Sequence, residues 1–430
     1  MNNPDDILEN RKSAPRLFYG WWIVGACFLL SILSGGIFII GFTAFIEPIV
    51  NEFGWSYAQV SLAASLRGAN VGLLAPLMGI LVDRWGPRRL LFTGVILLGL
   101  SLLLLSRLTS LIMFYGVFAV VAVGISGLSP TVMVTAVNSW FRKNAGLAIG
   151  IMSCGFSLGS LLVPTMVKII DTYSWRTAAL IFGAVICVIG IPLSFLVRHK
   201  PEHYGYLPEG EKSNGKVQHE STADEEATKD DIGIKEVLRS RTFWHIGLAM
   251  MLLFLPISAV TVHVMPYLSS VGIERTHAGM VAMAMPLVSV IGRLSAGWLG
   301  DRFKRTRVAT AFMLLIFLGL LFFSYASVEA SWLLTPFIIL FGIGWGSNLP
   351  MRAALIREYF KSNSIGTIFG FLMGLSAMGA VIGPLIAGWF YDNYGSYRIS
   401  WLLFACLAVI AMIIMITTPS SNKDTRRDKK

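Results

Sequence analysis

The stretch GILVDRWGPRR, residues 79 to 89, recurs as GWLGDRFKRTR at residues 297 to 307. Each copy follows a long apolar run and carries one acid among several basic residues, which a hydrocarbon interior would not tolerate. The repeat therefore marks two equivalent loops at the surface of a chain built from two similar halves.

A second repeat lies downstream of each loop. Residues 127 to 150 align without a gap to residues 347 to 370, and Pro130 falls opposite Pro350. Two halves that repeat in the same orientation predict a pseudo-twofold axis along the membrane normal, with a binding site between the halves.

The composition is that of a membrane protein. Of the 430 residues, 55% are hydrophobic and 14% are charged, and the mean hydropathy is +0.68. Apolar runs of about twenty residues are long enough to cross a hydrocarbon core of about 30 Å as helices. Twelve such runs are present, at residues 19–46, 57–82, 88–106, 110–139, 146–169, 176–198, 241–269, 277–300, 308–327, 331–357, 366–391 and 397–418.

We therefore expect an all-α membrane protein with twelve transmembrane helices in two pseudo-symmetric six-helix bundles. Residues 1–18 are polar and resemble no secretory signal, so the first run is expected to remain in the mature protein. The expected parts are an N-terminal tail (1–18), a first bundle (19–198), a polar linker (199–240), a second bundle (241–418) and a basic tail (419–430).

The net charge of +11 is unevenly distributed. Most Lys and Arg residues lie in the tails, the linker and the loops on the same side, which places both termini in the cytoplasm of a cell (inner) membrane. This asymmetry explains the basic composition without a nucleic-acid partner. The opposite loops keep only Arg107, Lys168, Arg176, Arg275 and Arg398.

Other function classes lack their signatures. Four cysteines lie singly in apolar runs, without a CxxC pair or histidines at ligand spacing, so neither a disulfide framework nor a metal site is expected. No catalytic nucleophile set or nucleotide-binding loop is recognisable, and we expect neither an enzyme nor a cofactor.

At this point the chain resembles the major facilitator superfamily over essentially its whole length, on the loop GxLxDRxGxRR, its degenerate second copy and the central linker. A narrower resemblance is to the monocarboxylate-porter and oxalate/formate-antiporter branch. It rests on WFRKNAGLAIGIMSCGFSLG (140 to 159) and GRLSAGWLGDR (292 to 302). In that branch, the arginine at the position of Arg293 binds the substrate carboxylate.

The sequence departs from the branch in two places. The animal carriers have an acid four residues before this arginine and a lysine in the first helix, whereas here Ser289 stands at the first position and the first run has no Lys. The exchangers have a second cation in the eleventh helix, but residues 366–391 contain no Lys or Arg.

Arg293 is the strongest candidate for substrate binding. It lies about 12 Å along the helix from Asp301, too deep to reach water easily by snorkelling. A planar guanidinium suits a carboxylate through two parallel hydrogen bonds. The alternative is an arginine tied to backbone carbonyls or to a polar group of another helix.

Further polar residues in the apolar runs are weaker candidates. His263 titrates near neutral pH, which makes it a candidate for substrate binding and for proton coupling, and Tyr267 shares its helical face. Arg67 and Arg352 are substrate or gate candidates, and Asn348 lies on the face of Arg352. In the two repeated loops, Asp83, Arg84, Arg88, Asp301 and Arg302 are expected to form a cytoplasmic gate that stabilises the outward-open state.

We expect secondary active transport of a small monocarboxylate, such as lactate or pyruvate, by alternating access, with Arg293 holding the carboxylate. Proton symport follows if His263 takes a proton or if the substrate crosses with one, whereas exchange of two anions needs neither. The alternatives are an exchanger or a dicarboxylate or other organic-anion transporter of the same fold, or a transport-dead sensor. The expected partners are a small organic anion, protons and membrane lipid, and a monomer is plausible.

Overall fold

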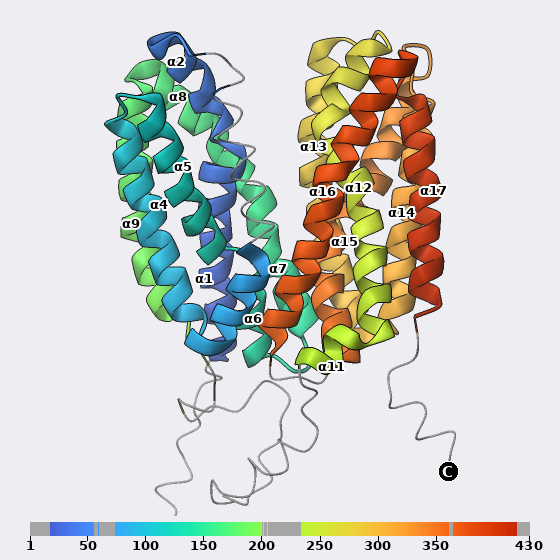
Figure 1. Cartoon of the computed structure of the whole chain (residues 1–430), viewed down its shortest axis with the longest axis horizontal. Coiled ribbons are helices and arrows are strands. Elements are labelled where there is room, and N and C mark those ends of the chain that lie inside the picture. The colour runs from blue at the N-terminus through green and yellow to red at the C-terminus, as the bar shows by residue number, and fades with distance from the viewer. Residues whose placement is uncertain are drawn as a thin grey trace, which may run out of the picture.

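The computed structural model describes residues 18–55, 59, 74–199, 201, 204, 234–360 and 364–418. Within these residues the chain forms two helical bundles that stand side by side (Figure 1). We call the end at which the first helix begins and the last helix ends the tail side, and the opposite end the far side.

The first bundle starts at the tail side and contains the helices up to Leu196. Its elements are α1 (Tyr19–Leu33), the π-helical η2 (Ser34–Ile40), α2 (Thr43–Phe53), a helix over 74–85, α4 (Pro87–Ser106), α5 (Leu111–Gly127), α6 (Pro130–Trp140), α7 (Ala145–Leu158), η3 (Gly159–Leu162), α8 (Val163–Thr172) and α9 (Trp175–Leu196).

The second bundle follows a short tail-side helix, α11 (Ile234–Arg239). Its elements are α12 (Arg241–Ser270), α13 (Arg275–Arg302), α14 (Arg305–Ser324), η5 (Ser331–Leu333), α15 (Leu334–Tyr359), α16 (Ile365–Tyr394) and α17 (Arg398–Ile416).

Eleven helices in the described residues are long and apolar enough to cross a membrane. They coincide with eleven of the twelve predicted runs, to within a few residues at most ends. The remaining prediction, 57–82, lies mainly outside the described residues, and its described part is helical from residue 74. The predicted class, an all-α membrane protein, is confirmed.

The first and fifth membrane segments are not single α-helices. The first changes to π-helix over η2 and the fifth to 3-10 helix over η3, where the two segments cross. A side chain on Gly36 would overlap the carbonyl of Gly159, and one on Gly35 would overlap the carbonyl of Phe156. These glycines allow backbone-to-backbone packing, as small residues do between membrane helices.

The fourth segment is also divided, between α5 and α6. Ser129 is extended and Pro130 opens α6, since proline lacks the N–H that would continue the helix. The matching Pro350 lies inside the continuous α15. The repeat therefore conserves the residue but not the break.

A polar cluster fastens the far side of the first bundle. Trp175 donates to Glu52 Oε2 at 2.7 Å, and Arg176 pairs with the same carboxylate and donates to the carbonyl of Leu108 at 3.1 Å. The hydrogen bond from Arg176 lowers the pKa of Glu52 below its ordinary value. The cluster joins α2 to the start of α9 and to the loop before α5.

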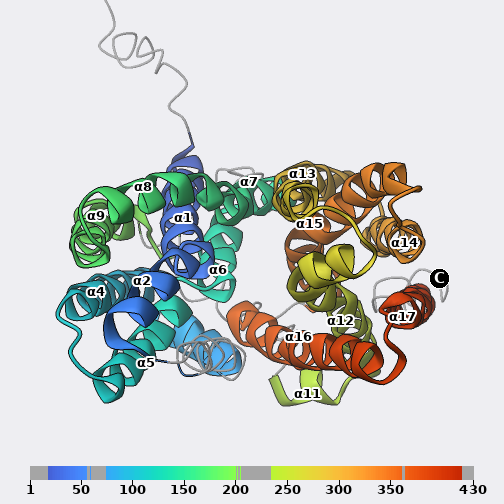
Figure 2. The ribbon, with the colours of Figure 1, turned by 90° about the horizontal axis from the view of Figure 1, so that it is seen from above.

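The two bundles meet at the tail side and diverge towards the far side (Figure 1). Seen from above, α7 lies beside α13, and the helix over 74–85 lies beside α16 (Figure 2). These two helix pairs make the seam that positions the candidate site.

Candidate functional site at the bundle seam

Asp301, at the end of α13, caps a helix of the other bundle. Its Oδ1 accepts from the N–H of Gly146 at 2.9 Å and its Oδ2 from the N–H of Leu147 at 2.9 Å. These N–H groups belong to the first turn of α7, where helices leave donors unpaired and favour negative charge. One carboxylate thus holds α7 against α13.

Asp83 makes the equivalent contact in the other half. Its Oδ1 accepts from the N–H of Gly366 at 3.0 Å, and its Oδ2 accepts from the N–H and the hydroxyl of Thr367 at 2.7 Å and 2.6 Å. These donors open α16. The two acids of the repeated loops therefore form a pseudo-symmetric pair of inter-bundle caps, which we call the tail-side caps.

The side chains of the arginines predicted to share this gate make other contacts or are exposed. Arg88 lies over the ring of Phe195 at 4.9 Å, Arg302 lies over Trp298 at 4.0 Å, and Arg84 is exposed. No inter-bundle hydrogen bond is assigned to their side chains in the described part of the chain.

An arginine that pairs with Asp301 is not among the residues predicted from the sequence. Arg357 of α15 approaches Asp301 Oδ1 at 3.6 Å. Arg357 stands at the tail-side end of a predicted span, where the positive-inside asymmetry alone accounts for a basic residue. No sequence motif distinguishes it from the other basic residues on that side.

Glycines allow α7 and α13 to pack backbone to backbone beside the Asp301 cap. A side chain on Gly297 would overlap the backbone of Gly146, and one on Gly150 would lie 2.6 Å from the carbonyl oxygen of Arg293. Further along, the hydroxyls of Ser157 and Ser289 are 3.1 Å apart. Because Ser289 donates to the carbonyl of Pro286 at 2.6 Å, its oxygen accepts from Ser157.

Arg293 occupies the middle of this seam. Its backbone is flanked by Gly150 of α7 on one side and by Gly346 of α15 on the other, so the helix carrying the side chain is held from both sides. The exposed apolar residues Leu287, Ile291 and Trp298 mark the lipid-facing side of α13. Arg293 lies more than about 100° around the helix from the centre of that side.

The guanidinium of Arg293 is partly buried, and its Nε is buried without a hydrogen-bond partner. Across the described residues no carboxylate pairs with it, and the acids of the tail-side caps are engaged elsewhere. A buried cation without a protein counter-ion is costly. An anion that accepts from this group would offset the cost.

Arg352 differs from Arg293 in being fully enclosed, with an exposed fraction of 1%. Its Nη2 donates to Asn348 Oδ1 and to Ser376 Oγ, each at 2.9 Å, and its other nitrogens contact the sulfurs of Met250 and Met373. These partners come from α12, α15 and α16 of one bundle. Asn348 is thereby committed to Arg352 through its oxygen, although its Nδ2 is buried without a partner.

The structure does not bring His263 and Tyr267 to Arg293. By helical rise His263 lies about 33 Å from the tail-side start of α12, whereas Arg293 lies about 13 Å from the tail-side end of α13. His263 Nε2 lies 3.0 Å from the carbonyl of Pro384 and Nδ1 lies 3.2 Å from the hydroxyl of Tyr397. A carbonyl only accepts, so Nε2 carries the proton and Nδ1 accepts from Tyr397.

Tyr267 lies among the rings of Phe323, Tyr397 and Trp401, with an exposed fraction of 2%. Its hydroxyl donates to the carbonyl of Phe323 at 2.6 Å. The helical face that Tyr267 shares with His263 therefore packs into the interior of the second bundle. Arg67 lies outside the described residues.

Metal binding finds no support in the described part of the chain, where no three His, Cys, Asp or Glu residues are grouped in a way that could hold an ion.

The chain matches the Major Facilitator Superfamily over residues 24–347 and 260–430, and it belongs to that superfamily. It is a multi-pass membrane transporter of that class, in agreement with the two bundles and the paired loops.

Curated relatives of this chain cover most of its length at low identity. Monocarboxylate transporter 12 of Mus musculus is 24% identical over 94% of this chain and 86% of its own length. Monocarboxylate transporter 13 of Bos taurus is 23% identical, covering 95% and 91%, and an uncharacterized MFS-type transporter of Bacillus subtilis is 22% identical, covering 94% and 95%.

Solved structures agree on the fold. The E. coli fucose:proton symporter superimposes with a TM-score of 0.70 at 14% identity, covering 94% of this chain and 99% of that one. A proton:xylose symporter gives 0.73 at 15% identity, covering 93% and 96%.

Proposed function

We propose that this chain is a secondary active transporter of small monocarboxylates and that Arg293 binds the carboxylate. The observation that carries the proposal is the unpaired guanidinium of Arg293, which is partly buried at the seam between the bundles with an Nε that lacks a partner. The names of the relatives, monocarboxylate transporters 12 and 13, support the substrate class.

The chemistry follows from the charge of this group. A guanidinium can donate two parallel hydrogen bonds to one carboxylate, and the pair is neutral as a whole. Binding would therefore lower the cost of enclosing the charge when the bundles close over the substrate. Arg352 adds no second free cation, because its donors are directed to Asn348, Ser376 and two methionine sulfurs.

Alternating access would proceed by opening the tail side and closing the far side. With the basic loops in the cytoplasm of a cell membrane, as the positive-inside asymmetry favours, the observed arrangement is outward-facing. The inward-facing state then requires Asp83 to leave the start of α16 and Asp301 to leave the start of α7.

Proton coupling, if the transporter is a symporter, is assigned to His263. It lies about 20 Å nearer the far side than Arg293, so it would act as a separate proton site and not as a second ligand of the same small anion. A proton added at Nδ1 turns this nitrogen into a donor, and the hydrogen bond with Tyr397 must then reverse. Anion exchange without protons remains the alternative mechanism.

The test is uptake of labelled monocarboxylates into liposomes containing the purified chain. We expect Arg293→Ala to abolish uptake and Arg293→Lys to raise KM roughly thirty-fold, since one bidentate charge-assisted contact is worth about 2 kcal/mol. Arg302→Gln is the matched control. It removes a guanidinium from the same helix, but this guanidinium stacks on the exposed ring of Trp298.

Unchanged uptake by a well-folded Arg293→Ala variant would overturn the assigned role. For coupling, we expect an acidic exterior to drive accumulation in the unsubstituted chain and not in His263→Gln. Accumulation that ignores the imposed pH difference would exclude symport and leave exchange.

A further inference from the structure

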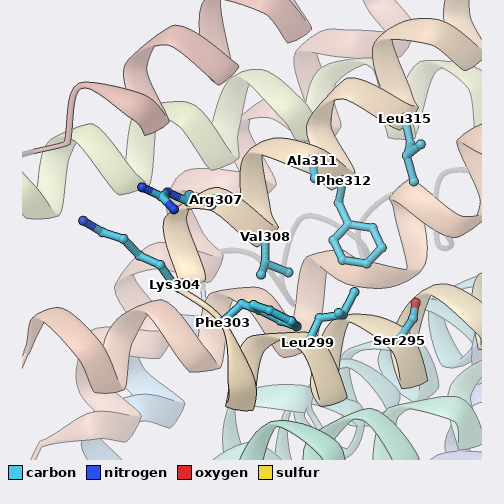
Figure 3. Close-up of a pocket in the computed structure, with 9 residues that line it drawn as sticks. All are labelled: Ser295, Leu299, Phe303, Lys304, Arg307, Val308, Ala311, Phe312 and Leu315. Atoms are coloured by element: carbon cyan, nitrogen blue, oxygen red, sulfur yellow. The ribbon is translucent and has the colours of Figure 1, made fainter.

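A groove of about 480 Å³ opens on the outer face of the second bundle, where α13 ends and α14 begins. Its floor and walls are apolar and include Leu299, Val308, Phe312 and Leu315 (Figure 3). At its tail-side mouth Lys304 and Arg307 extend to the same side, away from the apolar lining (Figure 3). We call this feature the basic groove.

The two cations at the mouth are available for a ligand, in contrast to their neighbours. Arg302 is stacked on Trp298, and Arg305 donates to the carbonyl of Gly300 at 3.3 Å. Lys304 and Arg307 are exposed, and within the described residues neither forms a hydrogen bond or an ion pair. The loop thus presents two free positive charges beside an apolar channel.

The position of the groove matches the boundary between hydrocarbon and headgroups. Phe303, which lines the groove, is 59% exposed, and Trp298 of the same helix end is 42% exposed; tryptophan side chains gather at membrane interfaces. From the mouth, the lining runs along α14 towards mid-membrane as far as Leu315. A ligand that fills the groove must be anionic at the interface and apolar below it.

We propose that the basic groove binds one anionic phospholipid of the tail-side leaflet. Its phosphate lies between Lys304 and Arg307, and one acyl chain lies along Leu299, Val308 and Phe312. Basic pockets between membrane helices recognise lipid headgroups in this way, each cation contributing to the attraction. The site is separate from the seam that holds Arg293.

The first half of the chain provides an internal comparison. In the repeated loop, Arg89 stands at the position of Arg307, but Gly86 replaces Lys304. Gly86 has a φ of +79°, and a side chain there would meet the ring of His199 at 3.0 Å. The first half therefore offers one cation where the second offers two.

The experiment is native mass spectrometry of the full chain in detergent, titrated with phosphatidylglycerol or with phosphatidylcholine of the same acyl chains. We expect preferential retention of phosphatidylglycerol. The double variant Lys304→Gln, Arg307→Gln should weaken that retention about twenty-five-fold, because each cation contributes a factor of about five. Arg89→Gln is the matched control and should retain the lipid as the unsubstituted chain does.

A second variant tests the apolar part. Ala311→Trp places a large ring in the groove, at a residue that lines it, and should lower the retention of both lipids without changing the elution volume of the protein. Equal retention of the two lipids, an unaffected double variant, or displacement of the lipid by glycerol phosphate at matched concentration would each overturn the proposal.

Discussion

Replacing Asp301 by Asn tests whether the tail-side caps hold the bundles in the observed arrangement. Asp301 accepts two backbone hydrogen bonds from α7, each of 2.9 Å, and stands 3.6 Å from Arg357. Hydrogen bonds to a charged group contribute about 1.5 to 3 kcal/mol each. Asparagine keeps one acceptor oxygen but turns an amide towards the second N–H. The observed arrangement should therefore lose about 2 kcal/mol of stability relative to the arrangement with the far side closed, which changes the ratio of the two populations roughly thirty-fold.

The assay measures the separation of the far-side ends by pulsed electron resonance. Tyr173, between α8 and α9, and Val328, between α14 and η5, are 71% and 58% exposed and suit spin labels after replacement of the native cysteines. We expect Asp301→Asn to raise the population at the shorter far-side distance. Adding Asp83→Asn should extend the shift to about a thousandfold, because both caps are then weakened.

Asp171→Asn is the control, since Asp171 is exposed near the far-side end of α8. The reasoning fails if the double variant leaves the distance distribution as it is in the unsubstituted chain. It also fails if Asp171→Asn shifts the distribution as far as the cap variants do.

Three further predictions concern the seam, the second arginine and the far side. Gly297→Ala should separate α7 from α13 and reduce uptake, because the new methyl would overlap the backbone of Gly146; overpacking of this kind costs about 1 to 3 kcal/mol, and the same spin-label pair reads the shift. Arg352→Met should leave KM for a monocarboxylate within about twofold, because the arginine's hydrogen bonds lie within its own bundle; a loss matching that of Arg293→Lys would favour the dicarboxylate alternative. Glu52→Gln should lower the stability of the folded chain at neutral pH by less than about 1 kcal/mol. Pairing with Arg176 depresses the pKa of Glu52 in the folded state. The difference in stability between the unsubstituted chain and Glu52→Gln should therefore be present above the ordinary pKa of a glutamate and vanish as the pH falls through the depressed pKa. Thermal melts at several pH values measure this difference.

The fold class could be predicted from the sequence because its main features have simple physical causes. Apolar runs of membrane length, the repeated loop and the asymmetry of basic residues each have one dominant cause. The tail-side caps were also foreseeable, since Asp83 and Asp301 occupy equivalent positions in the two repeated loops. The groups that these two acids contact could not be predicted. They are backbone N–H groups of the opposite bundle, and neither composition nor residue spacing identifies such groups.

The candidate site was less accessible to sequence reasoning. His263 and Tyr267 share a helical face, but that face is turned towards α14, α16 and α17, whose contacts with α12 cannot be read from one chain. Arg352 and Arg293 looked alike as intramembrane cations. What separates them is tertiary: Arg352 reaches Asn348 and Ser376, whereas the Nε of Arg293 reaches nothing in the described residues.

The lack of a protein counter-ion at Arg293 predicts different rates for the exchange and the net transport of substrate. Under the proposed role of Arg293, a carrier that returns empty must close its cavity over a guanidinium that has no protein counter-ion in the described residues, at a cost of several kcal/mol. A carrier loaded with a monocarboxylate would close over a neutral pair. We therefore expect exchange to outpace net flux by at least about tenfold. Liposomes preloaded with labelled monocarboxylate measure this directly, as efflux with and without unlabelled substrate outside. Equal efflux under the two conditions would mean that the empty site is neutralised by another group, and a proton-linked or carboxylate partner of Arg293 would then have to exist in the cycle.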